Sequence, residues 1–128
     1  MPTVSGLRTG VTLAFSVRDR KASAAWYGEH LGCSLLYDAE EIGWCEMATP
    51  LPGLSIGFGE RDEIAVGGPV PTWDVENLDT ARAELERQGV AFDGPTVIHE
   101  GVAKLATFFD PDGHALMLAQ NLASPPHA

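Results

Sequence analysis

The stretch TFFDPDGHALML, residues 107–118, decides the fold of this chain. It reads as a strand, a tight turn and a second strand. Within the turn, Pro111 presets the backbone angle φ of the first turn position, and the aspartates on either side of it can accept hydrogen bonds from nearby backbone amides. Gly113 supplies the positive φ that closes the hairpin. The apolar residues before the turn and the alternating residues after it therefore predict an antiparallel hairpin that closes a curved sheet.

Outward from this hairpin, the same order of elements is predicted twice. Repeat one covers about 11–59, where an alternating strand leads into a helix that begins after Asp19 and runs to about Leu31. Gly32 ends this helix. The strands of repeat one are expected at 11–17, 34–37, 42–48 and 54–58.

Repeat two covers about 70–121, after a turn-rich linker. Its helix is capped by Asn77 or Asp79 and stops at Gly89. Its strands are expected at 70–75, 96–99, 104–109 and 115–119. Aligning 12–19 with 70–77 sets aromatic on aromatic and valine on valine, so we interpret the chain as an internal duplication of one βαβββ unit.

These features resemble the vicinal oxygen chelate superfamily, which includes glyoxalase I, extradiol dioxygenases, fosfomycin-resistance enzymes and bleomycin-binding proteins. The resemblance covers about 11–121 and is carried by the repeat, by Trp26-Tyr27 before Leu31-Gly32, and by the Asp-Pro-Asp-Gly turn. It implies an α+β fold in which two tandem βαβββ units form a curved half-barrel sheet. We expect a single domain over 8–122, with flexible tails at 1–7 and 122–128.

The composition excludes some functions. A formal charge of -10 argues against nucleic acid and against anionic membranes, because phosphates are neutralised by clustered Lys and Arg and the chain has only 8 of these. No stretch approaches the roughly 20 apolar residues of a membrane span, and no basic segment leads into an apolar run at the N-terminus. We therefore expect a soluble, cytoplasmic protein. Cys33 and Cys45 are interpreted as buried free thiols.

Strand alternation predicts which side chains face a cavity. The superfamily's metal-binding members carry His or Glu at four inward positions, which the resemblance places at Thr12, Gly57, Val70 and Met117. None of these four is a competent ligand for zinc, nickel or iron. We therefore expect no metal and no cofactor. This expectation argues against glyoxalase, dioxygenase and fosfomycin-transferase activities.

The predicted cavity is apolar, with a few polar points that suit a small organic molecule. We expect its ligand to contact Thr12, Ser16, Trp44, Glu46, Ser55, Gly57, Val70, Thr72, Asp74 and Met117. Trp44 is either a stacking platform or a core or dimer contact. Lys104 is expected to pair with Glu46, with Asp74 or with an anionic ligand, or simply at the surface.

Glu46 is the candidate catalytic residue. It lies between apolar neighbours in a strand, and a dry cavity would raise its pKa and make it a general acid or base. If the strand is flipped, Glu46 is a surface charge.

Two functions remain open on these grounds. The first is a metal-free protein that binds a small organic molecule and protects by sequestration, as in the bleomycin-binding branch, with the acidic surface attracting cationic compounds. The second is an enzyme of the same fold, which would be metal-free with Glu46 as acid or base or would use a metal at displaced positions such as Glu46 and His99. The resemblance and the exposed sheet edges also lead us to expect a homodimer.

Overall fold

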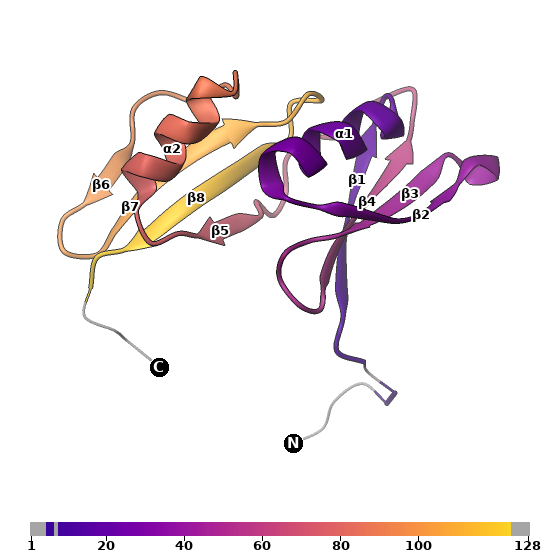
Figure 1. Ribbon diagram of the computed structural model, residues 1–128, viewed down its shortest axis with the longest axis horizontal. Coiled ribbons are helices and arrows are strands. Elements are labelled where there is room, and N and C mark those ends of the chain that lie inside the picture. Colours follow the sequence, from indigo (N-terminus) through magenta and orange to yellow (C-terminus); the bar gives the residue numbers. More distant parts are fainter. Residues whose placement is uncertain (1–4, 7, 124–128) are drawn as a thin grey trace. The chain divides into compact units, whose positions relative to one another are not determined.

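The computed structural model describes residues 5–6 and 8–123, so most of the tails expected at 1–7 and 122–128 lies outside the described residues. The chain divides into two compact units, Met1–Ile64 and Ala65–Ala128. Each unit contains one four-stranded sheet and one helix in the order βαβββ (Figure 1). This confirms the α+β fold with two tandem βαβββ units. The single domain over 8–122 stays a prediction.

The sheet of the first unit has the strand order β1-β4-β3-β2. β1 pairs with β4 in parallel, and the other neighbouring strands are antiparallel. Its elements are β1 (Val11–Val17), α1 (Arg20–Leu31), β2 (Ser34–Ala39), the 3-10 turn η1 (Glu40–Ile42), β3 (Trp44–Ala48) and β4 (Leu54–Glu60). The predicted strand over 42–48 therefore begins two residues late, because residues 40–42 form this turn and Gly43 leaves it at a φ of 63°.

The helix α1 begins and ends at the expected residues. The side chain of Asp19 accepts hydrogen bonds from the backbone amides of Lys21 and Ala22, and Gly32 closes the helix in the left-handed conformation. Tyr27 on its inner face is fully buried, and its ring lies 4.8 Å from that of Phe58 in β4. These apolar contacts cover one face of the sheet with α1 and leave the opposite face without a helix (Figure 1).

A charged cluster also joins α1 to the strands. Arg20, whose side chain is almost fully buried, donates two hydrogen bonds to Asp38 in β2, at 2.6 and 2.9 Å. Its backbone amide and guanidinium also donate to Glu60 at the end of β4. The guanidinium holds the pKa of Asp38 below its usual value, and these carboxylates raise the pKa of Arg20. The start of α1 is therefore tied to two strands.

The second unit repeats this plan, with the strand order β5-β8-β7-β6. Its elements are β5 (Thr72–Asp74), α2 (Leu78–Arg87), β6 (Val97–His99), β7 (Ala103–Phe109) and β8 (Ala115–Asn121). Asn77 rather than Asp79 caps α2, since its side chain accepts the amide of Thr80. Leu78 and Leu85 are the buried residues of α2.

The hairpin between β7 and β8 has the predicted turn. Asp110 is buried, and its Oδ1 accepts the backbone amides of Asp112 and His114, each at 2.9 Å. Gly113 has a φ of 89°. His114 is buried with only 6% exposure, because the turn folds it back onto Asp110. Neither α1 nor α2, the α-helices in the described part of the chain, has the length and apolar composition of a membrane span.

Candidate functional site

The open face of the first sheet carries the polar residues predicted from strand alternation. In the register of the sheet, Thr12 lies opposite Ser55, and Glu46 lies opposite Gly57 on the other side of β4. Leu13, Phe15 and Val17 alternate with the exposed residues of β1 and lie on the helix side. Thr12, Glu46 and Ser55 therefore meet on the face away from α1.

A bulge in β2 adds two side chains to this face. The pairing of β2 with β3 shifts between Leu35 and Tyr37, so that Leu35 lies opposite Met47 and Tyr37 lies opposite Glu46. Leu36, in the bulge, lines the same pocket as Glu46. The simple alternation used to interpret the sequence misses Leu36 and Tyr37, because an extra residue in one strand changes which face the following residues occupy.

Glu46 is held by three hydroxyl groups. Ser55 and Thr12 donate to its Oε2 at 2.8 and 3.1 Å, and Tyr37 donates to its Oε1 at 3.0 Å. These donors stabilise the charged form, so the hydrogen bonds from Ser55, Tyr37 and Thr12 lower the pKa of Glu46 even though partial burial opposes them. The pKa of Glu46 is therefore lowered rather than raised as a dry cavity would require, and Glu46 is a fixed carboxylate.

Trp44 fills the part of this face next to Glu46. Its Nε1 donates to the hydroxyl of Tyr37 at 3.0 Å. The ring lies so close to Gly57 that a Cβ built on that residue would overlap the indole, and it also lies against Gly59. Glycine is therefore required at position 57 by the approach of the ring. Of the two roles predicted for Trp44, packing within the unit is the one this geometry supports.

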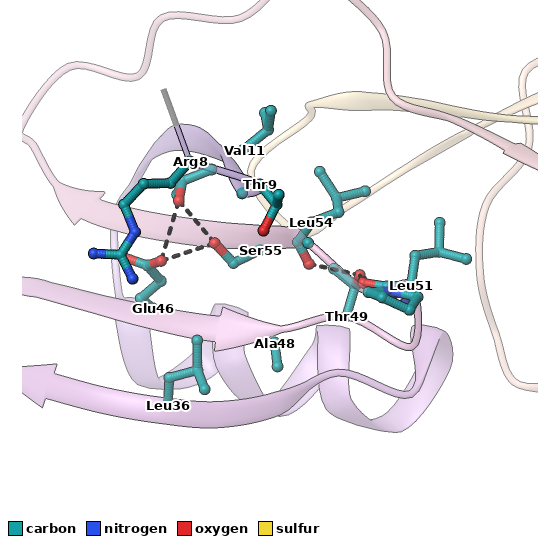
Figure 2. Close-up of a pocket in the computed structure, with 14 residues that line it drawn as sticks. Arg8, Thr9, Val11, Leu36, Glu46, Ala48, Thr49, Leu51, Leu54 and Ser55 are labelled. Atoms are coloured by element: carbon teal, nitrogen blue, oxygen red, sulfur yellow. Dashed lines mark hydrogen bonds between the residues drawn. The ribbon is translucent and has the colours of Figure 1, made fainter. Parts of the chain in front are cut away.

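A pocket of about 590 Å³ lies on the same face (Figure 2). Its polar wall includes Thr12, Glu46 and Ser55, and its apolar wall includes Leu36, Leu51 and Leu54. The remaining lining residues come from the segment before β1, from β1 and β3 and from the β3–β4 loop: Arg8, Thr9, Gly10, Val11, Ala48, Thr49, Pro52 and Gly53. Every lining residue belongs to the first unit.

The loop between β3 and β4 shapes one end of the pocket. Thr49 holds it, since its hydroxyl accepts the amide of Leu51 at 3.1 Å and donates to the carbonyl of Leu54 at 2.8 Å. Gly53 turns with a φ of 80° and comes so close to Thr9 that a Cβ there would lie 2.5 Å from the Thr9 carbonyl oxygen. The amide of Val11 donates to the carbonyl of Gly53 at 2.7 Å, which fastens the start of β1 to the loop.

The other predicted ligand contacts are divided between the units. Ser16 lies on the open face of β1, outside the residues that line the pocket. Val70, Thr72, Asp74 and Met117 belong to the second unit. There Thr72 lies opposite Met117 in the parallel pair β5 and β8, and the hydroxyl of Thr72 donates to the carbonyl of Val70 at 3.0 Å. The pocket therefore contains three of the ten predicted contacts.

Lys104 has a different partner from those expected in the cavity. Its Nζ lies 2.9 Å from Asp79 of α2, where it forms an exposed ion pair on the helix side of β7. Of the alternatives given for Lys104, the structure has the pairing at the surface. Residues 104 and 79 both lie in the second unit.

The four positions that hold metal ligands in the superfamily do not fit a metal ion here. The hydroxyl of Thr12 already donates to Glu46 and lies 2.7 Å from that of Ser55, and Gly57 has no side chain and is covered by Trp44. Val70 and Met117 offer no imidazole, carboxylate or thiolate. Across the described residues, no three His, Cys, Asp or Glu side chains gather closely enough to hold a metal.

Sequence comparison places the chain in a family. The family model of the Glyoxalase/Bleomycin resistance protein/Dioxygenase superfamily matches residues 11–118. A comparison with curated proteins finds no matching sequence.

Solved structures with the same fold include three instructive ones. A glyoxalase/bleomycin resistance protein/dioxygenase from Nocardioides is 21% identical with a TM-score of 0.75, covering 98% of this chain and 91% of that one. TnmS3, an antibiotic-binding protein from Streptomyces sp. CB03234, is 24% identical with a TM-score of 0.72, covering 91% of this chain and 98% of that one. The fosfomycin resistance protein FosX from Listeria monocytogenes is 16% identical with a TM-score of 0.72, covering 95% of this chain and 94% of that one.

Proposed function

Because the chain belongs to the glyoxalase/bleomycin resistance protein/dioxygenase superfamily, we propose that it binds a small organic molecule with a protonated nitrogen and holds it without chemical change. The ligand occupies the pocket on the open face of the first unit, and sequestration of an antibiotic or toxin is the biological role that we infer. The observation that carries this proposal is the carboxylate of Glu46, which three hydroxyls hold at the pocket wall.

A carboxylate that is fixed in its charged form is suited to binding a cation. The hydrogen bonds orient the carboxylate before the ligand arrives, so little conformational entropy of this side chain is lost on binding. The same hydrogen bonds lower the pKa of Glu46 and make it a weak base, which disfavours a role as general acid or base near neutral pH. The geometry therefore favours binding over the acid–base enzyme predicted as the alternative.

The size and lining of the pocket support the same proposal. A volume of about 590 Å³ suits a drug-sized molecule, and the leucines of its apolar wall can bury the carbon frame of such a ligand. The net charge of -10 adds a long-range attraction for cations. Among proteins of this fold, TnmS3 is named as antibiotic-binding, which gives a precedent for such a role on this fold.

Calorimetric titration with a panel of organic amines, each paired with a neutral analogue of the same shape, tests the proposal. We expect amines to bind more tightly than their analogues, and Glu46→Gln to weaken amine binding by about tenfold or more while leaving the neutral analogues unaffected. Glu84→Gln on the exposed face of α2 changes the net charge equally and is the matched control. Equal binding of amines by wild type and Glu46→Gln would refute the proposal.

Mass spectrometry of the bound compound separates the two candidate functions. After prolonged incubation with a molar excess of compound, a sequestering protein returns it unaltered and saturates at one equivalent. Conversion of more than one equivalent would instead establish the enzyme.

A further inference from the structure

The pocket of the first unit contains two opposite charges. Glu46 and Arg8 both line it, and Figure 2 shows the side chain of Arg8 extending from the segment before β1 on the same side as the carboxylate. Within the described residues, no ion pair of 4.0 Å or less joins them. The pocket therefore presents a cation and an anion that do not neutralise each other by direct contact.

Arg8 differs from Arg20 and Arg82 in the hydrogen bonds that its guanidinium makes. Arg20 donates to Asp38 and Glu60, and Arg82 donates to Glu86, Thr96 and the carbonyl of Gly94. In the part of the chain that the structure describes, the guanidinium of Arg8 has no such partner, and its five N–H donors are available to a ligand. A guanidinium with free donors matches the two oxygens of a carboxylate or phosphate.

One hydrogen-bond acceptor position of the Glu46 carboxylate is left for a ligand. A carboxylate offers about four acceptor positions, and hydroxyl groups occupy two on Oε2 and one on Oε1. The remaining position on Oε1 can accept one N–H. Leu36, Leu51 and Leu54 supply apolar surface in the same pocket.

We propose that the pocket takes an amphoteric small molecule, which carries a protonated amine and a carboxylate-like anionic group on an apolar frame. The amine binds Glu46, the anionic group binds Arg8, and the frame lies against the leucines. This inference rests on the proposed function, because it keeps the amine at Glu46. It goes further in requiring an anionic group as well, which a simple organic cation lacks.

Four six-carbon probes test the inference on the full-length protein. Norleucine and ε-aminocaproate carry both charges at different spacings, whereas hexylamine and hexanoate carry one each. Titration followed by NMR measures their affinities for wild type, Arg8→Gln, Arg8→Lys and Glu46→Gln. Arg87→Gln, at the end of α2 in the other unit, is the control for a change in net charge.

We expect one of the two amphoteric probes to bind wild type about tenfold more tightly than hexylamine or hexanoate. Arg8→Gln should remove this advantage while hexylamine still binds, which also shows that the variant is folded. Arg8→Lys should keep part of the advantage, because it retains the charge and loses the planar pair of donors. Arg87→Gln should change none of these ratios.

Two different results would refute the inference, and they differ in whether the proposed function is refuted with it. If hexylamine binding depends on Glu46 and neither amphoteric probe binds more tightly than hexylamine, the amphoteric ligand is wrong and the proposed function stands. If Glu46→Gln leaves hexylamine binding unchanged, both are wrong.

Discussion

The indole Nε1 of Trp44 donates a hydrogen bond of 3.0 Å to the hydroxyl oxygen of Tyr37. Because an indole N–H can only donate, the phenol oxygen is the acceptor, and its own proton is directed to Oε1 of Glu46. Tyr37 is 50% exposed, and yet its hydroxyl is oriented from both sides. The charge of Glu46 is therefore supported by a chain of two aromatic residues as well as by the serine and threonine.

Replacing Tyr37 tests this chain. Tyr37→Phe removes a donor to Glu46 and the acceptor of Trp44, so we expect the pKa of Glu46 to rise toward its usual value and the free energy of unfolding to fall by about 1 kcal/mol. Carbon NMR of the Glu46 carboxyl and urea unfolding measure the two effects. Trp44→Phe is the matched control, since it keeps the bond from Tyr37 to Glu46 and should shift the pKa less. An unchanged pKa in Tyr37→Phe would contradict the role of the hydroxyl.

The dependence of amine binding on pH follows from the lowered pKa of Glu46. A carboxyl whose pKa is lowered in the folded protein stays charged down to below its usual value of 4.5. Amine binding should therefore be constant from neutral pH down to about that value and weaken only as the pH falls through the lowered pKa.

Ser55→Ala should move this weakening to higher pH, because Ser55 makes the largest contribution to lowering the pKa of Glu46. Ser34→Ala, at an exposed position in the edge strand β2, is the control and should leave the pH profile in place. Calorimetry at closely spaced pH values measures both profiles. A shift to lower pH in Ser55→Ala would be the opposite of the expected sign.

Gly57 has no room for a side chain beside the ring of Trp44. A methyl group there would overlap the ring of Trp44, so we expect Gly57→Ala to lower the free energy of unfolding by about 1–3 kcal/mol. Removing the ring should relieve the overlap. In the background of Trp44→Ala, the same substitution should cost much less, and urea unfolding of the four variants in the cycle measures this coupling. Equal costs in the two backgrounds would show that the ring is not the cause.

The cluster around Arg20 predicts a stability that depends on pH. Asp38 has a lowered pKa in the folded protein, so its contribution is present above its usual value of 3.8 and is lost as the pH falls through the lowered pKa. Asp38→Asn should therefore lower the melting temperature at neutral pH, and the difference from wild type should shrink in acid. Thermal unfolding across this range measures the difference. Asp62→Asn, in an exposed segment after β4, should show no such dependence.

Local chemistry explains what could be predicted from the sequence. The cap at Asp19, the left-handed Gly32 and the hairpin turn at Asp110 depend on neighbouring residues, and the structure has all three as expected. Strand alternation likewise placed Thr12 and Ser55 on one face, since regular strands keep a period of two, and Glu46, whose face the sequence left open, joins them there.

Contacts between distant residues explain what the sequence could not predict. The bulge in β2 depends on pairing with β3, so Tyr37 carried no local signal as a partner of Glu46. Arg8 precedes the first strand, where no periodicity assigns it to a face, and the adjoining segment is held by a long-range hydrogen bond from the amide of Val11 to the carbonyl of Gly53. The homodimer stays a prediction, which light scattering at several protein concentrations will test.

The bulge in β2 also has a consequence for solubility. β2 is an outer strand of its sheet, and Leu35, Leu36 and Tyr37 in its middle are each at least half exposed. A regular strand with such side chains would be a template for pairing with other copies of the chain and for growth into aggregates. The extra residue interrupts the even spacing of backbone donors and acceptors along the outer side of β2. We therefore expect the distortion that brings Tyr37 to Glu46 also to disfavour pairing of this outer strand with other copies of the chain.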